Sequence, residues 1–290
     1  MLRKYVKPLA SLLVLVVTAL AFAHFVSTHP AARHQLANVH PAVLLLLLGL
    51  YALVLGCLVL AQEGTLDMCA TRLGRSETLL LTMYTAIVNF FGPLQSGPGF
   101  RAVYLKKKYG TKLKNYALAT LLYLGFYAGF SGLFLLSGVI GWQWLLLLAL
   151  LGACVIAVAV RLELPLVGRL KSLAWRGSVK LGVATLLQVS ITAIIYYVEL
   201  RSVNHAVHFS QAVIYTGAAN FALFVSVTPA AIGFRESFLL FSQHLHHINT
   251  TTIVNASLID RGVYVLFLGI LVLAALGLHA KQRLQSSSTA

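Results

Sequence analysis

The feature that most limits how this chain can fold is a series of long apolar stretches. Seven of them contain no Asp, Glu, Lys or Arg, and each is 17 to 21 residues long. A helix needs about 20 such residues to cross the hydrocarbon core of a bilayer. The seven are Pro8–Val26, Pro41–Ala61, Thr78–Leu94, Tyr116–Leu136, Trp142–Val160, Leu181–Val198 and Ala212–Pro229. An eighth stretch, roughly Leu258–His279, contains only Asp260 and Arg261 near its start.

The composition argues against a water-soluble fold. Hydrophobic residues make up 59% of the 290 residues and charged residues only 10%, whereas about 25% of a soluble domain is charged. A closed β-barrel would show short alternating strands instead of long apolar stretches. We therefore predict an all-α polytopic membrane protein, with one membrane domain over residues 1–290. The tripeptide Ala21–Phe22–Ala23 resembles a signal-peptide cleavage site, but we expect a retained first helix because the apolar stretch continues beyond it.

The basic residues predict the topology, because cytoplasmic loops are rich in Lys and Arg. Basic residues at positions 3–7 place the N-terminus inside, and those at 72–75 place the second loop inside. The next loop, residues 101–114, contains six Lys and Arg and should also be inside. Both loops can be cytoplasmic only if Thr78–Leu94 does not cross. We therefore predict a re-entrant hairpin that breaks at Gly92–Pro93, a geometry allowed where the irregular backbone is buried in protein or lines a cavity.

The same rule accounts for the rest of the chain. A cytoplasmic C-terminus requires a second re-entrant hairpin, entering from outside within residues 212–248. The prediction is about six full transmembrane helices plus two hairpins, with both termini in the cytoplasm and most of the 22 Lys and Arg on that side.

The two predicted hairpins resemble each other in sequence. The hairpins lie in two groups of opposite orientation, an inverted-topology repeat with halves at about residues 1–140 and 141–285. Interrupted segments at corresponding positions of such halves mark the binding site of many transporters. Asparagine, proline, glycine and arginine recur in the same order, as Asn89, Pro93, Gly97 and Arg101 in the first hairpin and Asn220, Pro229, Gly233 and Arg235 in the second. Pro98 follows Gly97, and we assign the prolines and glycines to hairpin architecture.

Ionisable residues in the apolar stretches are the candidate site. Such groups are costly in a membrane and usually pair or line a polar path, and the arginine fork suits phosphate. The candidates for lipid binding and translocation are Asn89, Arg101, Asn220, Arg235, Glu236, Asp260 and Arg261. Three alternatives stay open. Arg235–Glu236 and Asp260–Arg261 form structural pairs or sit at the interface, the asparagines satisfy free backbone groups, or Asp260 binds a proton. For Glu199, at the end of its stretch, we expect an interfacial position.

At these hairpins the sequence resembles the flippase-like membrane domain of lysylphosphatidylglycerol synthases. The Asn-x3-Pro-x3-Gly-x3-Arg element is matched by Asn89 through Arg101, and the Pro-x3-Gly-x-Arg-Glu element by Pro229 through Glu236. The chain departs from the family at Gln95, Pro98 and Ala230–Ala231, which leaves the lipid unnamed. The resemblance implies a standalone version, without the synthase domain, that moves a phospholipid or a related anionic or isoprenoid-type lipid between leaflets of the bacterial cytoplasmic membrane.

Two other functions stay open at this point. One is a non-catalytic membrane partner of a lipid synthase or glycosyltransferase, and the other is an integral membrane enzyme that modifies lipids. No catalytic spacing of Ser, His and Asp is present, so we predict that the chain is not an enzyme. We predict no cofactor and no metal, and membrane lipids with anionic headgroups as partners rather than nucleic acid. The histidines near His244–His247 either bind metal, sense pH or are ordinary loop residues.

Overall fold

The computed structural model describes residues 39–91, 96–161, 175–225 and 234–288. All regular structure in these ranges is helical, as predicted from the long apolar stretches. The helices are α3 (Pro41–Met68), α4 (Arg75–Phe91), α5 (Gly97–Tyr109), α6 (Leu113–Arg161), α8 (Trp175–Val203), α9 (Phe209–Val225), α10 (Phe234–Phe241), α11 (Gln243–His246) and α12 (Thr250–Ser288).

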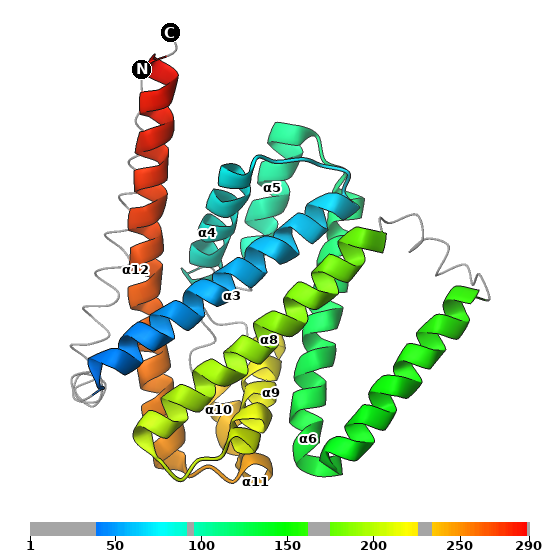
Figure 1. Cartoon of the computed structure of the whole chain (residues 1–290), viewed down its shortest axis with the longest axis vertical. Helices are drawn as coiled ribbons and strands as arrows, with labels where there is room; N and C mark the ends of the chain where they lie inside the picture. Colours follow the sequence, from blue (N-terminus) through cyan, green and yellow to red (C-terminus); the bar gives the residue numbers. More distant parts are fainter. Residues whose placement is uncertain (1–38, 92–95, 162–174, 226–233, 289–290) are drawn as a thin grey trace.

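Four segments of the described part are long and apolar enough to cross a membrane. They are Pro41–Met68, Leu113–Ile140, Trp175–Val203 and Thr250–Leu278. Each coincides with one of the predicted transmembrane stretches. The predicted stretch Trp142–Val160 is helical and forms the second arm of α6, which turns sharply part-way along its length (Figure 1). The stretch Pro8–Val26 lies outside the described residues, so the total of six crossings stays a prediction.

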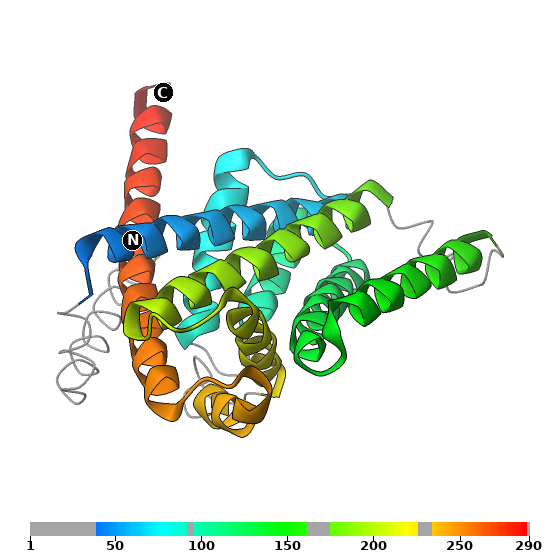
Figure 2. The ribbon, with the colours of Figure 1, turned by 60° about the horizontal axis from the view of Figure 1, so that its bottom comes forward.

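Helices α3 and α8 form the most extensive pair in the described structure. They run antiparallel and side by side in both views (Figures 1 and 2). Gly64 and Gly177 meet at their crossing, where a Cβ on either glycine would lie 2.8 Å from the carbonyl oxygen of the other. Small residues at a crossing allow two backbones in a membrane to approach closely. Beside this contact, Lys180 on α8 pairs with Glu63 on α3.

Two helical hairpins pack against this pair. Helices α4 and α5 contact each other and form the first, and α9 and α10 form the second. In Figure 1 the first hairpin lies in the upper half of the molecule and the second in the lower half. Helix α4 ends at Phe91 and α5 begins at Gly97, so these two helices lie on either side of the break predicted at Gly92–Pro93. The predicted hairpin residues Pro93, Pro229 and Gly233 lie outside the described residues, and the re-entrant character of both hairpins stays a prediction.

Helix ends that border the basic loops gather on one side of the molecule. The start of α4, the end of α5, the start of α8 and the end of α12 all lie toward the top of Figure 1. The end of α8, the start of α9, α11 and the start of α12 lie toward the bottom. The arrangement therefore separates the loops rich in Lys and Arg from those rich in His.

Candidate functional site

A cavity of about 320 Å³ lies between the two hairpins and the helices that support them. It is lined by side chains from both hairpins and from α3, α6, α8 and α12. Much of the lining is polar. The polar and charged residues are Tyr51, Thr65, Thr82, Thr85, Asn89, Arg101, Tyr116, Thr120, Tyr123, Tyr127, Gln188, Thr192, Tyr196, Asn220, Arg235, Asp260, Arg261 and Tyr264. The structure thus brings six of the seven predicted site residues to one cavity, and the seventh, Glu236, contacts Arg261 in its wall.

Arg101 reaches this cavity from α5. Its Nε lies 3.5 Å from the Thr85 hydroxyl on α4, which fixes the guanidinium against the other arm of the same hairpin. Among the residues that the structure describes, no carboxylate pairs with Arg101. A cation in a partly buried polar cavity without its own counter-ion is a suitable binding group for an external anion.

Arg235, on α10, has a carboxylate partner. Its Nη1 donates to Asp260 on α12, and the Asp260 carboxylate also accepts a hydrogen bond from the Tyr51 hydroxyl on α3. The guanidinium lies over the Tyr196 ring at 4.9 Å from the centroid, a cation–π contact. Its Nε and Nη2 have no hydrogen-bond partner among the described residues. The contacts of Arg235 and Asp260 therefore join α3, α8, α10 and α12. They leave the Nε and Nη2 donors of Arg235 without a described partner beside the cavity.

A second ion pair connects α10 and α12, the helices that carry Arg235 and Asp260. Arg261 on α12 donates from Nε to Glu236 on α10 at 3.1 Å, and Ser257 donates to the same carboxylate oxygen at 2.8 Å. The structural pairing considered from the sequence, Arg235 with Glu236 and Asp260 with Arg261, is therefore wrong in its partners. Arg235 pairs with Asp260, and Glu236 pairs with Arg261. Successive side chains on a helix do not face each other, so neighbours in sequence do not pair here.

Glu199 is buried within the protein, with 1% of its surface exposed. The interfacial position predicted from its place at the end of its stretch stays a prediction. Helices α9 and α12 both contact α8. The Glu199 carboxyl group interacts with Asp260, Arg235 and Tyr51, and no described residue donates a hydrogen bond to its Oε1.

The two asparagines have structural contacts as well as cavity positions. The Asn89 Oδ1 accepts a hydrogen bond from the Gly97 backbone amide at 3.4 Å, which connects α4 to the first residue of α5. Asn220 donates to the Ser131 hydroxyl on α6 at 3.1 Å and is 1% exposed. The Pro98 carbonyl accepts from the Tyr116 hydroxyl at 3.1 Å. These contacts fit the alternative of structural support, although Asn89, Asn220 and Pro98 also line the cavity.

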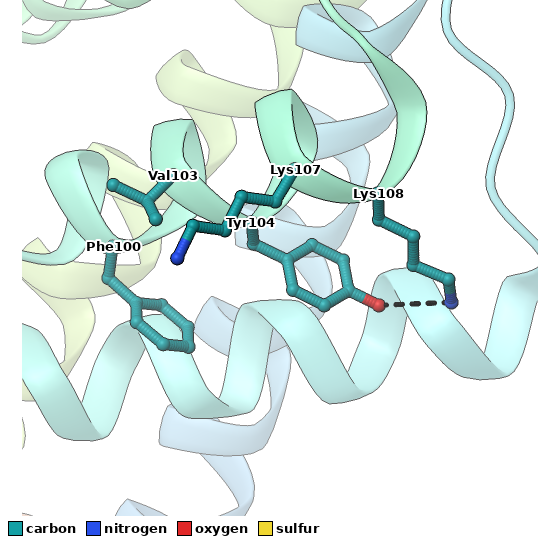
Figure 3. Close-up of a pocket in the computed structure, with 5 residues that line it drawn as sticks. All are labelled: Phe100, Val103, Tyr104, Lys107 and Lys108. Carbon is teal, nitrogen blue, oxygen red and sulfur yellow. Dashed lines mark hydrogen bonds between the residues drawn. The ribbon is translucent and has the colours of Figure 1, made fainter.

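A separate, shallow hollow lies on the outer face of α5. Phe100, Val103, Tyr104, Lys107 and Lys108 line it, and Figure 3 shows these side chains along one face of the helix. The Lys108 Nζ lies 3.2 Å from the Tyr104 hydroxyl. Helix α5 therefore presents Arg101 to the cavity and an apolar and basic surface to the outside.

A hydrogen-bonded cluster fixes the basic end of this hairpin. Tyr104, Lys108 and Tyr109 on α5 all contact the Glu77 carboxylate at the start of α4. Partial burial raises the pKa of Glu77, but the hydrogen bonds from Lys108 and the two tyrosines outweigh it and hold that pKa below its usual value.

The histidine-rich segment contains one fully buried member. His246 on α11 is 0% exposed, and its Nε2 lies 3.1 Å from the Leu239 carbonyl oxygen. Its Nδ1 accepts a hydrogen bond from the Ile248 amide at 3.2 Å. Within the described ranges, no three His, Cys, Asp or Glu residues lie close enough together to hold a metal ion.

The tyrosines of the cavity were missed by the sequence reasoning. Tyr51, Tyr116, Tyr123, Tyr127 and Tyr196 all lie in apolar stretches and all reach the cavity. A buried tyrosine hydroxyl usually finds a hydrogen-bond partner, so a tyrosine deep inside an apolar stretch was a usable signal for a polar path.

Comparison with known proteins agrees with the membrane fold. No match was found among curated proteins. The family described as "Lysylphosphatidylglycerol synthase TM region" matches residues 8–272, which is most of the chain and includes the helices that line the cavity. The chain therefore belongs to the family of the lysylphosphatidylglycerol synthase transmembrane region.

Proposed function

We propose that this protein moves a lipid with an anionic headgroup, a phospholipid or a related isoprenoid-type lipid, from one leaflet of the membrane to the other. The proposal makes the chain a transporter and not an enzyme. Its family is a membrane domain of proteins of the lysylphosphatidylglycerol synthase type, which supports a lipid substrate.

The observation that carries the proposal is the position of Arg101. It lies in a cavity between the two hairpins, and no described carboxylate pairs with it. A guanidinium presents a planar set of donors that matches phosphate oxygens. Because two donors of Arg235, Nε and Nη2, have no partner among the described residues and Arg235 lines the same cavity, a headgroup that leaves Arg101 has a second cation to contact.

The size of the cavity suits a headgroup and not a whole lipid. Pockets for small ligands measure roughly 300 to 1,000 Å³, and about 320 Å³ lies at the lower end of that range. We infer that the headgroup passes through the polar cavity while the acyl chains stay among the exposed apolar side chains, such as Leu121 and Leu187. This arrangement avoids exposing the charged headgroup to the hydrocarbon core.

The orientation follows from the charges. The side that gathers the basic loops is the cytoplasmic side under the positive-inside rule, and anionic lipids of that leaflet attract such loops. We therefore place the first hairpin at the cytoplasmic side of a bacterial inner membrane and the second at the outer side, as halves of an inverted repeat.

The test is leaflet exchange in liposomes that contain the purified protein and labelled lipids of several headgroup classes. We expect exchange of anionic lipids with the native protein. Arg101→Gln should abolish it, and Arg101→Lys should retain only part of it, because lysine keeps the charge but not the fork. Lys107→Gln, on the outer face of α5, is the matched control and should behave as the native protein.

Absence of exchange for every lipid class, with correctly folded protein, would refute the proposal. A stable complex with a lipid synthase or glycosyltransferase, combined with unchanged cellular function of the Arg101→Gln protein, would instead identify a non-catalytic partner. Mass spectrometry of the lipids distinguishes both from an enzyme, since only an enzyme alters their covalent structure.

A further inference from the structure

Glu199 lies in a buried cluster that contains more carboxyl groups than cations. The side chains of Glu199 and Asp260 are 1% and 6% exposed, and Arg235 is the cation that pairs with Asp260 there. The other groups facing Glu199 are hydroxyls, from Tyr51 on α3, Tyr196 on α8 and Tyr215 on α9. Tyr127 and Tyr264 border Arg235 and Asp260. Two ionised carboxylates and one guanidinium would leave an uncompensated negative charge in this site.

The hydrogen bonds indicate which carboxyl group is ionised. Both oxygens of Asp260 accept from donors, Oδ1 from the Tyr51 hydroxyl and Oδ2 from the Arg235 guanidinium. Among the described residues, Glu199 has no salt bridge to a cation, and its Oε1 has no hydrogen-bond partner. A buried carboxylate oxygen without a donor is strongly unfavourable. A proton on Glu199 removes that charge and gives the group a donor that the Asp260 carboxylate can accept.

We propose that Glu199 is a proton-binding site, in which the bound proton stays on Glu199, is donated in a hydrogen bond to the Asp260 carboxylate, and exchanges with water through the adjoining cavity. The step is a simple transfer in which a hydronium ion gives its proton to a Glu199 carboxylate oxygen and leaves as water. No other bond changes. Asp260 stays the carboxylate that accepts from Tyr51 and Arg235.

The position of Arg235 connects this proton to the lipid, an extension that rests on the proposed function. With Glu199 protonated, Asp260 is the counter-ion of Arg235, and the Nε and Nη2 donors stay free at the cavity. Loss of the proton creates a second carboxylate beside Arg235. That carboxylate competes with an anionic headgroup for the guanidinium, so proton binding favours headgroup binding at Arg235.

The proton site is tested first without lipid transport. Infrared spectroscopy of the purified protein in detergent should show the carbonyl band of a protonated carboxyl group near neutral pH. The band should disappear in Glu199→Gln. It should persist in Glu63→Gln, because the Glu63 carboxylate is partly exposed and paired with Lys180. A native protein without the band, or a Glu199→Gln protein that keeps it, overturns the proposal.

The second measurement is lipid exchange as a function of pH. The native protein should exchange anionic lipid faster as the pH falls from about 8 to about 5, by up to about tenfold per pH unit for a one-proton site. Glu199→Gln, which mimics the protonated form, should be fast and vary less than about twofold over the same range. A Glu199→Gln protein with the native pH profile overturns the coupling. If the native protein exchanges no lipid at any pH, the proposed function fails and the infrared band alone decides the proton site.

Discussion

Arg101 and Arg235 reach the same cavity from different helical hairpins, but within the described structure only Arg235 pairs with a carboxylate. The difference assigns them different roles. Asp260 and the Tyr196 ring hold Arg235 in place, whereas the contact of Arg101 with Thr85 leaves its charge unneutralised.

Loss of either partner of the Arg235–Asp260 pair should destabilise the protein strongly. Arg235→Gln and Asp260→Asn each leave one buried charge without its counter-ion, a change that costs about 3–5 kcal/mol. The double variant should lose less than the sum of the two single variants. Thermal unfolding in detergent measures the effect.

The control for this prediction is an exposed ion pair. The Lys108 side chain is 53% exposed where it meets Glu77, so Lys108→Gln should cost only about 0–1 kcal/mol. Equal losses for the buried and the exposed pair would contradict the prediction.

Gly97 should be intolerant of a side chain at the junction of the first hairpin. A Cβ at this position would lie 2.9 Å from the Thr85 carbonyl oxygen on α4, and 3.1 Å from the Asn89 Cβ. Gly97→Ala should therefore cost about 1–3 kcal/mol of stability and reduce lipid exchange. Gly99 is two residues further along α5 and has no atom within 4 Å of such a Cβ, so Gly99→Ala is the matched control. The hairpin packing described above would be wrong if both variants behaved alike.

The stability of the His-rich end should depend on pH through His246. Burial lowers the pKa of His246 below its usual value of 6.5. The unfolded chain therefore binds a proton at a higher pH than the folded protein does. The stability that neutral His246 contributes is fully present above about pH 6.5 and is lost as the pH falls through the lower folded-state pKa. Protonation also removes the lone pair of Nδ1 that accepts from the Ile248 amide.

The measurement for His246 is the unfolding temperature across this pH range. His246→Gln should show a flatter pH dependence than the native protein, although it is less stable at neutral pH. His244→Gln changes an exposed histidine of the same helix and should keep the native pH dependence. A native slope in the His246→Gln protein would exclude His246 as its source.

The inverted topology predicts opposite accessibility for α5 and α11. In a protein whose cysteines have been replaced, Lys107→Cys should react with an impermeant thiol reagent only from the cytoplasm. His244→Cys should react only from outside. His246 is unsuitable for this test because it is fully buried. Reaction of both positions from the same side would rule out an inverted repeat.

The helices were predictable because they depend on local composition. Stretches such as Pro41–Ala61 and Leu181–Val198 fulfil the length and apolarity of a membrane span without reference to other residues, and both occur within helices of that kind. The break before α5 follows from the prolines and glycines between Gly92 and Gly99. These properties belong to single segments of the chain.

The partners of the charged residues were not predictable in the same way. Glu236 is adjacent to Arg235 in sequence but pairs with Arg261, which is brought to it by the packing of α10 on α12. The groups that surround Glu199 likewise come from distant parts of the sequence, Tyr51 on α3, Arg235 on α10 and Asp260 on α12. No pattern within one stretch indicates which other stretch will cover it, so the sequence identified the charged groups without their pairing.

The contact between Gly64 and Gly177 also limits how the protein can change shape. A shift of α8 by one residue along α3 would bring the Cβ of Arg176 or Ser178 against the Gly64 carbonyl, where the glycine at 177 leaves only enough room for a hydrogen. The register of these two helices is therefore fixed by their contact. Under the transport function proposed above, we expect α3 and α8 to move as one rigid body while the hairpins tilt against it.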